Sequence, residues 1–424
     1  MNQAFRSTGR YLFLQGMATQ FLTRLADALD ARGHVVKRIN FNAGDRLFWR
    51  LPGAVDYRGG IADWPQFLER SLTDWHITDI VLFGAGRPLH SIAIRVAGRY
   101  GIKVHMFEEG YFRPGWITLE QSGGMQFPRD AAGYRLAAAL LSSAPAGAPV
   151  TDSFPARAGQ DILYYVWSWL WSSRYPGYRA HCRQVGLRFA QMAVDPFREY
   201  AGWLRRLAWT PAQRRRTAAA LCKLEAGAKP YYFFPLQLDY DSQIQIYSPL
   251  GNLASVLAVI IDSFARRAPK DTQLVIKEHP LDPHLTDWRA LTATLARRFG
   301  VEDRIVYLVG GPLDQLACKS RGMVTVNSTS GLSALALHVP VVALARPIYD
   351  LEGLTFQHGL DRFWKEASAP DGALFDAFRR VVIDRTHING GYFSAQAVDL
   401  AVAGSVARLE SAVPRLIVAA GARG

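Results

Sequence analysis

Cysteine is scarce in this sequence, and the sequence has no metal-binding motif and no apolar run long enough to span a membrane. Cys182, Cys222 and Cys318 lie far apart and without metal-ligand spacing, which argues against a disulfide framework and against a zinc site. The longest aromatic and apolar run covers only residues 162–171, whereas a bilayer-spanning helix needs roughly 20 residues. We therefore expect a cytoplasmic protein without a bound metal and without a transmembrane helix.

Low-complexity tracts and an apolar signal core are missing too. Arg6 and Arg10 precede only the brief apolar run 11–14, which predicts a first strand rather than a secretion signal. Hydrophobic residues make up 49% of the chain and charged residues 20%, as in folded globular proteins. Because 424 residues exceed the size at which one hydrophobic core stops growing, we expect two domains.

Negative charge is in deficit. The chain has 49 Lys and Arg against 36 Asp and Glu, for a formal net charge of +13. Such an excess of positive charge favours negatively charged binding partners, such as nucleic acid, a phospholipid surface or anionic substrates. The sequence has no zinc-finger, RNP-like or Walker pattern, and its arginines do not form one recognition helix. We therefore expect no nucleic-acid partner.

Short apolar strands alternate with helical stretches in both halves of the chain, which predicts parallel sheets covered by helices on both faces. We predict an α/β protein of two Rossmann-like domains whose parallel sheets face each other across a cleft. The first domain covers 1–225 with an aromatic and basic insertion at about 130–216, the second covers 226–385, and helices in 386–424 pack back on the first. The predicted strands are 11–15, 35–41, 77–84 and 103–108 in the first half, and 231–236, 273–277, 304–309, 323–326 and 341–345 in the second.

Polar motifs stand at the carboxyl ends of these strands, where open α/β sheets bind ligands. Glu108-Glu109-Gly110 closes the fourth strand. Adjacent carboxylates on an extended backbone point in different directions, so one can serve as a general base for a hydroxyl while the other binds backbone or Arg113. The alternative is that both glutamates only cap a helix or form salt bridges. Gly110 supports a tight turn in either case.

The strand 273–277 ends in Lys277-Glu278-His279-Pro280. Pro280 stops the ladder and fixes the backbone, which holds His279 at the strand tip. A histidine there can donate to a phosphate or protonate a leaving group. The alternative is a structural histidine.

Two further motifs follow strands of the second half. Asn327-Ser328-Thr329-Ser330-Gly331 precedes a helix, and hydroxyls with free amides at a helix start can bind an anion, although an ordinary N-cap would need only one hydroxyl. Asp239 and Asp241 follow the strand 231–236, where one can act as a nucleophile or stabilise an oxocarbenium-like centre. As the alternative, either aspartate caps the following turn.

An aromatic and basic stretch lies in the predicted insertion. Its mixture of interfacial aromatic side chains and positive charge suits an anionic lipid surface or a lipid head group. Tryptophan at alternate positions is also compatible with the inward face of a buried strand. The residues are Tyr164, Tyr165, Trp167, Trp169, Trp171, Arg174, Tyr175, Tyr178, Arg179 and Arg183.

Four blocks, in this order, give the chain a family resemblance. It resembles the capsule polysaccharide biosynthesis/export family, most closely the KpsS/LipB-type β-Kdo transferases. The resemblance implies a GT-B fold, with an acceptor domain first and a nucleotide-sugar domain second. The blocks are Glu108–Tyr111 with Arg113-Pro114 and Thr118–Glu120, Pro235–Gln237 through Asp241-Ser242, Lys277–Pro280, and Asn327–Gly331.

The resemblance also implies an activity. It implies transfer of a β-linked Kdo from CMP-Kdo to a lysophosphatidylglycerol-like lipid, the first step of a capsule linker. It places the protein at the inner face of the inner membrane of a Gram-negative cell, beside other capsule assembly proteins. No metal or cofactor is expected besides the nucleotide sugar. The alternatives are a CMP-sialic-acid-dependent transferase and a non-catalytic scaffold for capsule assembly or export.

The same resemblance suggests roles for single residues. Glu108 or Glu109 would handle the acceptor hydroxyl, and Asp241 looks like the nucleophile of a retaining double displacement, with Asp239 as its rival. His279 and Ser328 to Ser330 would hold the CMP phosphate. The remaining positions would line the nucleotide site (Lys277, Glu278, Pro280, Asn327, Gly331) or surround and support the acceptor (Gly110, Tyr111, Arg113, Gln237, Ser242).

Overall fold

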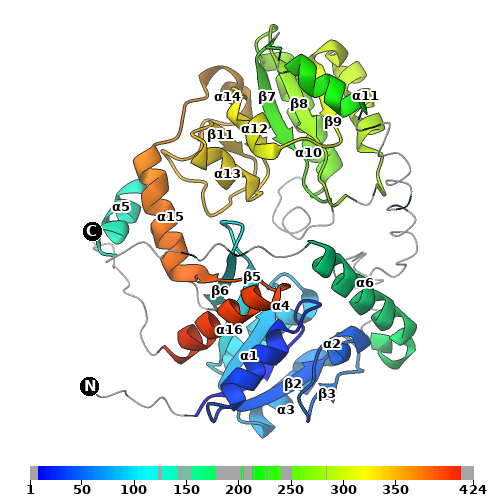
Figure 1. Cartoon of the computed structure of the whole chain (residues 1–424), viewed down its shortest axis with the longest axis vertical. Helices are drawn as coiled ribbons and strands as arrows, with labels where there is room; N and C mark the ends of the chain where they lie inside the picture. Colours follow the sequence, from blue (N-terminus) through cyan, green and yellow to red (C-terminus); the bar gives the residue numbers. More distant parts are fainter. Residues whose placement is uncertain are drawn as a thin grey trace. The chain divides into compact units, whose positions relative to one another are not determined.

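The chain divides into two units, which are described one at a time (Figure 1). Unit 1 takes its residues from Met1–Phe127, Ser143–Pro196 and Val382–Gly424, and unit 2 from Pro128–Ser142 and Phe197–Val381. The structure is a computed structural model that describes residues 8–122, 127–141, 147, 150, 154–177, 202, 204, 213, 215–224, 226–227, 229–239, 251–282 and 284–411.

Unit 1 contains a seven-stranded sheet in the order β12-β6-β5-β4-β1-β2-β3. Its strands are β1 (Arg10–Phe13), β2 (Val35–Asn40), β3 (Val55–Asp56), β4 (Asp79–Phe83), β5 (Lys103–Glu109), β6 (Trp116–Gln121) and β12 (His387–Asn389). Strands β1 to β5 pair in parallel, whereas β6 and β12 run antiparallel to their neighbours. The helices of the unit are α1 (Phe21–Asp30), α2 (Ala43–Leu47), α3 (Trp64–Asp74), α4 (Pro88–Arg99), α6 (Phe154–Leu170) and α16 (Ala395–Glu410), with a 3-10 turn at Ser172–Arg174.

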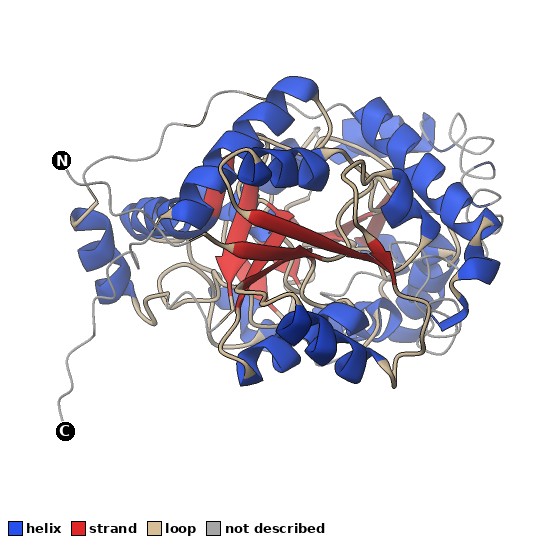
Figure 2. Ribbon diagram, turned by 90° about the horizontal axis from the view of Figure 1, so that it is seen from below, coloured by secondary structure: helices blue, strands red, loops and turns tan. Residues whose placement is uncertain are grey.

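Both faces of the unit 1 sheet are covered, and strand β1 explains why. Leu12 packs into a core on one face with Trp64 of α3, while Phe13 packs on the other face with Phe21 of α1. Successive side chains of a strand point to opposite faces, so a strand in the middle of a covered sheet has to be apolar throughout. The strands of this unit lie between helical layers in Figure 2.

The C-terminal helix α16 packs on α1 of the same unit. The ring of Phe21 lies 5.1 Å from the rings of both Phe107 and Tyr392, edge to face. Arg24 pairs with Asp399, and Arg32 Nη1 lies 3.0 Å from Glu410 Oε2. The described part of 386–424 therefore completes the core of unit 1.

Unit 2 contains a five-stranded sheet in the order β11-β10-β7-β8-β9, parallel throughout. Its strands are β7 (Tyr231–Pro235), β8 (Gln273–Lys277), β9 (Ile305–Leu308), β10 (Met323–Thr325) and β11 (Val341–Ala343). Its helices are α5 (Ala131–Ala139), α10 (Leu253–Arg267), α11 (Trp288–Phe299), α12 (Leu313–Cys318), α13 (Ser330–Ala336), α14 (Leu360–Glu366) and α15 (Gly372–Thr386), with a 3-10 turn at Glu302–Arg304; the last turn of α15 leads into unit 1.

Local sequence signals define the long helices of unit 2. Helix α10 begins after Asn252, whose side chain accepts the Ser255 N–H at 2.8 Å and so satisfies an otherwise unpaired amide. Helix α11 ends at Gly300 in the left-handed conformation, with φ 66°, where glycine is not strained. The buried face of α10 then packs against Trp364 of α14, whose indole N–H donates to Ser263 Oγ at 2.8 Å.

The structure corrects three expectations. Residues Trp116–Gln121, where no strand was predicted, form β6 paired with β5. Residues around Trp167 form helix α6, so the buried-strand alternative is wrong. Helix α5, which we expected within the first domain, clusters with unit 2 because Tyr134 packs on Phe378 with ring centroids 5.1 Å apart. The contact between Tyr134 and Phe378 joins segments far apart in the chain, which local patterns do not reveal.

Candidate functional site at the carboxyl ends of the two sheets

In unit 1 the crevice between β1 and β4 is the topological switch point, because the chain continues from β1 to β2 on one side and later fills β4 and β5 on the other. Ligands of open α/β sheets bind at such points. Gly84 ends β4 with φ +80°, and Arg87 Nη1 donates to the carbonyl oxygen of Gly16, beyond β1, at 3.0 Å. The loops that follow β1 and β4 are therefore tied together by an arginine.

The two adjacent glutamates at the end of β5 have different partners. Glu109 Oε2 lies 2.5 Å from Arg113 Nη2, and its other oxygen lies 2.7 Å from Arg157 Nη1 of α6. Glu108 Oε1 accepts the Ala85 N–H at 3.4 Å, directly beyond β4. Glu108 thus points toward the switch point and Glu109 toward α6, as expected for neighbours on an extended backbone. Glu109 also forms the salt bridge to Arg113 that we had considered.

The residues that follow Glu109 turn the chain into β6. A Cβ atom on Gly110 would lie 2.3 Å from the Trp116 carbonyl oxygen, so only glycine fits there. The Tyr111 hydroxyl donates to Glu120 Oε1 at 2.9 Å, and burial together with that carboxylate raises the tyrosine pKa above its usual range. His387 Nε2 of β12 accepts the Tyr111 N–H at 3.1 Å. The turn is therefore rigid and fixes the position of Glu109.

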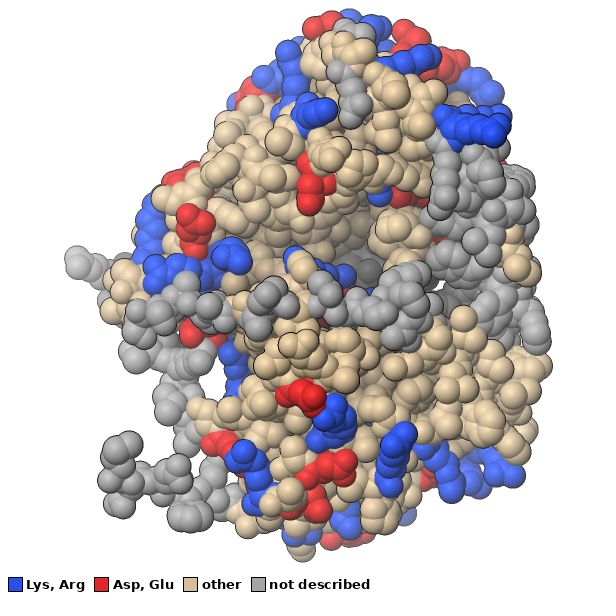
Figure 3. All heavy atoms as spheres, in the orientation of Figure 1, with Lys and Arg blue, Asp and Glu red and all other residues tan. Residues whose placement is uncertain are grey.

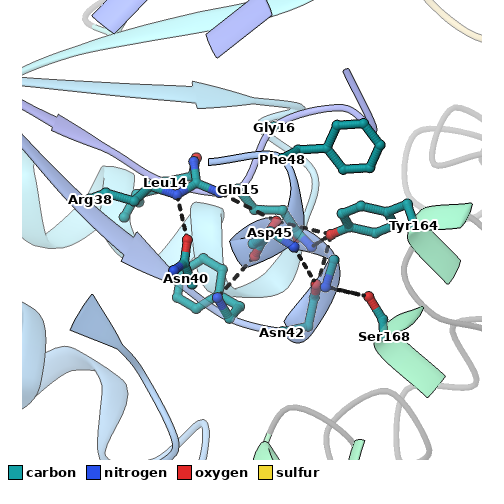
Figure 4. A network of polar contacts seen from close by, with 12 residues as sticks. Leu14, Gln15, Gly16, Arg38, Asn40, Asn42, Asp45, Phe48, Tyr164 and Ser168 are labelled. Atoms are coloured by element: carbon teal, nitrogen blue, oxygen red, sulfur yellow. Dashed lines mark hydrogen bonds and ion pairs between the residues drawn. The ribbon is translucent and has the colours of Figure 1, made fainter. Parts of the chain in front are cut away.

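Helix α6 joins unit 1 at this edge through Tyr164 and Ser168, which Figure 4 shows pointing toward the loop between β2 and α2. The Tyr164 hydroxyl accepts from Gln15 Nε2 at 2.7 Å and from Asn42 Nδ2 at 2.9 Å, and it donates to Asp45 Oδ1 at 3.0 Å. Ser168 Oγ accepts the Gly44 N–H at 2.8 Å. One tyrosine thus connects the ends of β1 and β2.

A buried ion pair lies beneath this contact. Arg38 Nη2 is 3.4 Å from Asp45 Oδ1, and the two side chains are only 4% and 1% exposed. Burial lowers the pKa of Arg38 and raises that of Asp45, and each charge opposes the other's shift. We did not predict these residues; the only signal was a cluster of polar residues after a strand. A pocket beside the pair is lined by Gly16, Met17, Thr19, Leu22, Arg38, Asp45, Phe48 and Trp49.

In unit 2, two of the predicted blocks meet between the ends of β7 and β10. Gln237 Oε1 accepts the N–H groups of Val326 and Asn327 at 3.2 and 3.3 Å, and its Nε2 donates to Asn327 Oδ1 at 3.0 Å. Gln237 therefore fixes the backbone that enters the Ser and Thr turn. Asp239 Oδ1 accepts the Leu253 N–H at the start of α10 at 2.9 Å, which is a structural role at a helix start 14 residues further along the chain. Asp241 and Ser242 lie outside the described residues.

Lys277 and Glu278 at the end of β8 are both buried, with 6% and 4% exposure. Glu278 Oε2 accepts from the Tyr307 hydroxyl at 2.9 Å, and Oε1 lies 2.7 Å from His284 Nε2. Burial and the Glu278 charge raise the pKa of Tyr307 far above its usual range. We expected Glu278 to line the nucleotide site, whereas its carboxylate is enclosed by partners from β9 and from the loop before α11.

His279 has a defined proton arrangement. Its Nδ1 accepts the Leu281 N–H at 3.0 Å, so Nδ1 carries no proton and a neutral ring carries its proton on Nε2. That Nε2–H can donate to a phosphate oxygen. Complete transfer of the same proton would leave an imidazolate, so the geometry favours phosphate binding over protonation of a leaving group.

The Asn327–Gly331 turn leads into α13. Ser328 Oγ accepts the Ser330 N–H at 3.2 Å, whereas the Thr329 side chain makes no capping bond. A Cβ atom on Gly331 would lie 2.4 Å from the Tyr349 hydroxyl oxygen, and that hydroxyl donates to the Ser328 carbonyl oxygen at 2.5 Å. Ser330 Oγ is buried without a hydrogen-bond partner among the described residues. The turn thus uses one hydroxyl for capping and has another directed inward.

The described part of the chain has neither a cluster of metal-binding side chains nor a membrane-spanning helix. Its His, Cys, Asp and Glu side chains form no group of three or more that could hold a metal ion. Its helices are all too short or too polar to span a bilayer. The predicted residues Tyr178, Arg179 and Arg183 lie outside the described residues.

The fold and the site define a protein of two α/β units, each with polar clusters at the carboxyl ends of its strands. Residues 78–393 match the family model described as capsule polysaccharide biosynthesis protein. The chain belongs to this family. It is 34% identical over 404 residues to the capsule polysaccharide modification protein LipB of Neisseria meningitidis serogroup B, covering 93% of this chain and 94% of LipB. It is 32% identical to the capsule polysaccharide export protein KpsS of Escherichia coli, over 91% of this chain and 97% of KpsS.

Solved structures resemble the chain only distantly. Thermosulfurimonas dismutans KpsC, described as a β Kdo 2,7 transferase, has 12% identity and a TM-score of 0.42, with 93% of this chain and 99% of that chain covered. A glycosyltransferase from Rickettsia africae has 9% identity and a TM-score of 0.37, with 95% of this chain and 98% of that chain covered.

Proposed function

We propose that the protein is a retaining glycosyltransferase that transfers β-linked Kdo from CMP-Kdo to a lysophosphatidylglycerol-type lipid and so begins a capsular polysaccharide linker. The observation that carries this proposal is that Asn327, Gln237 and His279 follow the ends of the three neighbouring strands β10, β7 and β8, in that order, in unit 2. Its relatives are named for capsule modification and capsule export, which supports a reaction on a capsule precursor.

The donor is proposed to bind in unit 2. The Ser328–Gly331 turn offers hydroxyls and backbone amides, and the His279 ring stands at the end of β8, so both are proposed to bind phosphate oxygens. Lys277 adds a buried positive charge at the same strand end. Glu278 is proposed to support the donor site without binding the donor, because its carboxylate already contacts Tyr307 and His284. The proposed reaction needs no metal and no cofactor besides the nucleotide sugar.

The nucleophile is proposed to be Asp241. Its rival Asp239 already accepts the first amide of α10, and a carboxylate bonded to a helix start is a weaker nucleophile because that bond stabilises its charge. In a double displacement, an Asp241 oxygen bonds to the anomeric carbon as the bond to the CMP phosphate breaks. The acceptor oxygen then replaces Asp241 at that carbon, so two inversions give net retention.

The acceptor is proposed to bind in unit 1, at the ends of β4 and β5. Glu108 points to the switch point, and the ion pair of Glu109 and Arg113 lies next to it at the end of β5. Gly110 and Tyr111 hold this ion pair in place, because they form the turn into β6. The acceptor hydroxyl therefore approaches an edge that is rich in carboxylates.

Membrane attachment is proposed to use the outer face of α6. Large apolar side chains are exposed there, and Figure 3 shows few charged side chains over this part of unit 1. The Arg174 guanidinium lies 4.5 Å from the centre of the Trp171 ring, which combines an interfacial aromatic with a charge that attracts anionic lipid. The exposed residues are Ile162, Leu163, Trp167, Leu170 and Trp171.

The deciding experiment offers the purified protein CMP-Kdo and a synthetic lysophosphatidylglycerol, and it follows CMP release and product mass. We expect a product heavier by one or more Kdo residues. Product from CMP-sialic acid but not from CMP-Kdo would make the protein a sialyltransferase. Absence of CMP binding by calorimetry, with liposome binding retained, would make it a scaffold instead.

A further inference from the structure

Helix α6 crosses the carboxyl edge of the unit 1 sheet. Arg157, in its first half, binds Glu109 at the end of β5, and Tyr164, two turns later, binds Gln15 beyond β1 and Asp45 beyond β2. The sheet order at this edge is β5-β4-β1-β2. The part of α6 between these two anchors therefore lies over the end of β4 and the switch point.

Asp161 occupies that middle position. Positions 157, 161, 164 and 168 share one face of a helix, because side chains three and four residues apart are neighbours. The other three of them contact the sheet edge. The Asp161 side chain is 24% exposed, so it belongs to the inner face and is still accessible to a ligand. Asp161 thus lies on the face of α6 that is turned toward the sheet edge, near Glu109.

The carboxylates around the crevice are not equivalent. Glu109 gives one oxygen to Arg113 and the other to Arg157, at 2.5 and 2.7 Å. Asp161 Oδ2 lies 3.9 Å from Arg157 Nε, which is beyond hydrogen-bond distance. Charge-assisted hydrogen bonds stabilise the ionised form of a carboxylate and make it a poor proton acceptor. Among the described residues, Asp161 therefore lacks the charge-assisted hydrogen bonds that hold both oxygens of Glu109.

The electrostatic surroundings agree with this difference. Burial raises the pKa of Asp161 to about 6; the Glu109 charge on β5 adds to the rise, and Arg157 on α6 opposes it. Arg113, from the loop after β5, neutralises Glu109 from the other side. A carboxylate with a pKa near neutrality suits general base catalysis, because it is ionised at the working pH and still binds a proton well.

We propose that Asp161 is a catalytic residue that takes the proton of the acceptor hydroxyl, while Arg157 and Glu109 position it. The inference rests on the proposed transferase function. In the transfer step the acceptor O–H bond breaks and the proton passes to an Asp161 oxygen. The acceptor oxygen forms the new bond to the anomeric carbon, and the bond from that carbon to the carboxylate nucleophile breaks with its electron pair.

The test compares Asp161→Asn with wild type over pH 5 to 8, using CMP-Kdo, synthetic lysophosphatidylglycerol and mass spectrometric product detection. In wild type, kcat/KM should fall as pH drops below about 6, because Asp161 becomes protonated. Asp161→Asn should lower kcat/KM about 100-fold or more at neutral pH and abolish this acidic limb. Asp161→Glu should retain the limb, since it keeps a carboxylate. Asp399→Asn, at a surface ion pair on α16, is the matched control and should leave both features unchanged.

The outcomes distinguish failure of the Asp161 proposal from failure of the proposed transferase function. A near-normal rate in Asp161→Asn, or an acidic limb that persists in this variant, overturns the proposal. A limb that disappears instead in Glu108→Gln assigns the base to Glu108 and overturns it too. If wild type forms no product from CMP-Kdo, the proposed function has failed and the inference falls with it. If wild type is active and only the Asp161 results disagree, the inference alone has failed. Thermal unfolding of each variant checks that the fold is intact.

Discussion

The carboxyl edges of the two units are built in different ways. In unit 2 the polar groups come from the loops that directly follow β7, β8 and β10, and the main link, Gln237 to Asn327, is a set of uncharged hydrogen bonds. In unit 1 the edge is held by a helix from outside the sheet, through Arg157 and Tyr164, and by charged pairs. Uncharged bonds suit a site that must take a negative ligand, whereas the charged pairs of unit 1 surround Asp161, the carboxylate proposed to accept a proton.

The strongest test of this division compares two neighbouring aspartates. Asp241→Asn should lower transferase activity on the order of 10⁴-fold or more, because removal of a catalytic nucleophile has effects of that size. Asp239→Ala, which removes the oxygen that accepts the Leu253 N–H, should weaken the start of α10 by about 1 kcal/mol and leave most of the activity. Steady-state kinetics and chemical denaturation measure the two effects. Equal losses of activity would show that the nucleophile has been assigned wrongly.

The next test concerns the rigid turn of unit 1. Gly110→Ala should lower the free energy of unfolding by roughly 1–3 kcal/mol, because the new Cβ would lie 2.3 Å from the Trp116 carbonyl oxygen and the backbone has to move. Gly98→Ala on α4, where a Cβ meets nothing within 4 Å, should be neutral or stabilising. Urea unfolding distinguishes them. Similar values for the two variants would mean that the turn has room to adjust.

Two polar substitutions compare the edges directly. Tyr164→Phe leaves Gln15 and Asn42 without their acceptor in unit 1, and Gln237→Leu leaves the Val326 and Asn327 amides without theirs in unit 2. Each should cost about 1–3 kcal/mol of stability. Only Gln237→Leu should weaken CMP binding, as measured by calorimetry. Tyr100→Phe, at a tyrosine that is 50% exposed, is the control and should change neither quantity.

The smallest effect is expected at the outer face of α6. Trp167→Ala should reduce binding to liposomes with anionic lipid severalfold without altering CMP affinity, because its ring is exposed on the proposed membrane face. Leu337→Ala removes an exposed apolar side chain from unit 2 and should not affect liposome binding. Flotation assays at increasing salt should show weaker binding if Arg174 and its neighbours contribute by charge. Binding that ignores both Trp167 and salt would assign membrane attachment to another surface.

Much of the architecture was predictable because it depends on local patterns. The alternation of apolar strands and helices predicted β1, β2, β4 and β5 to within a few residues, and each strand-end motif follows the strand that was expected. The antiparallel β6 was missed because the turn that forms it depends on close backbone contact at Gly110, and its register depends on pairing with β5. Helix α5 was placed in the wrong unit because its apolar face gives no indication of which core it joins.

The sequence by itself determined which residues stand at the strand ends, since hydrophobic periodicity locates the strands and chain order then places Glu108 to Gly110, His279 and the Ser and Thr turn. Only the tertiary structure decided how these residues differ from one another. The bonding of Glu109 to two arginines, the bond of Asp239 to the start of α10 and the closeness of Asp161 to Glu109 all depend on partners distant in the chain or in another element. Such contacts arise when whole faces of helices pack, because apolar burial drives that packing and polar groups near it must then find partners.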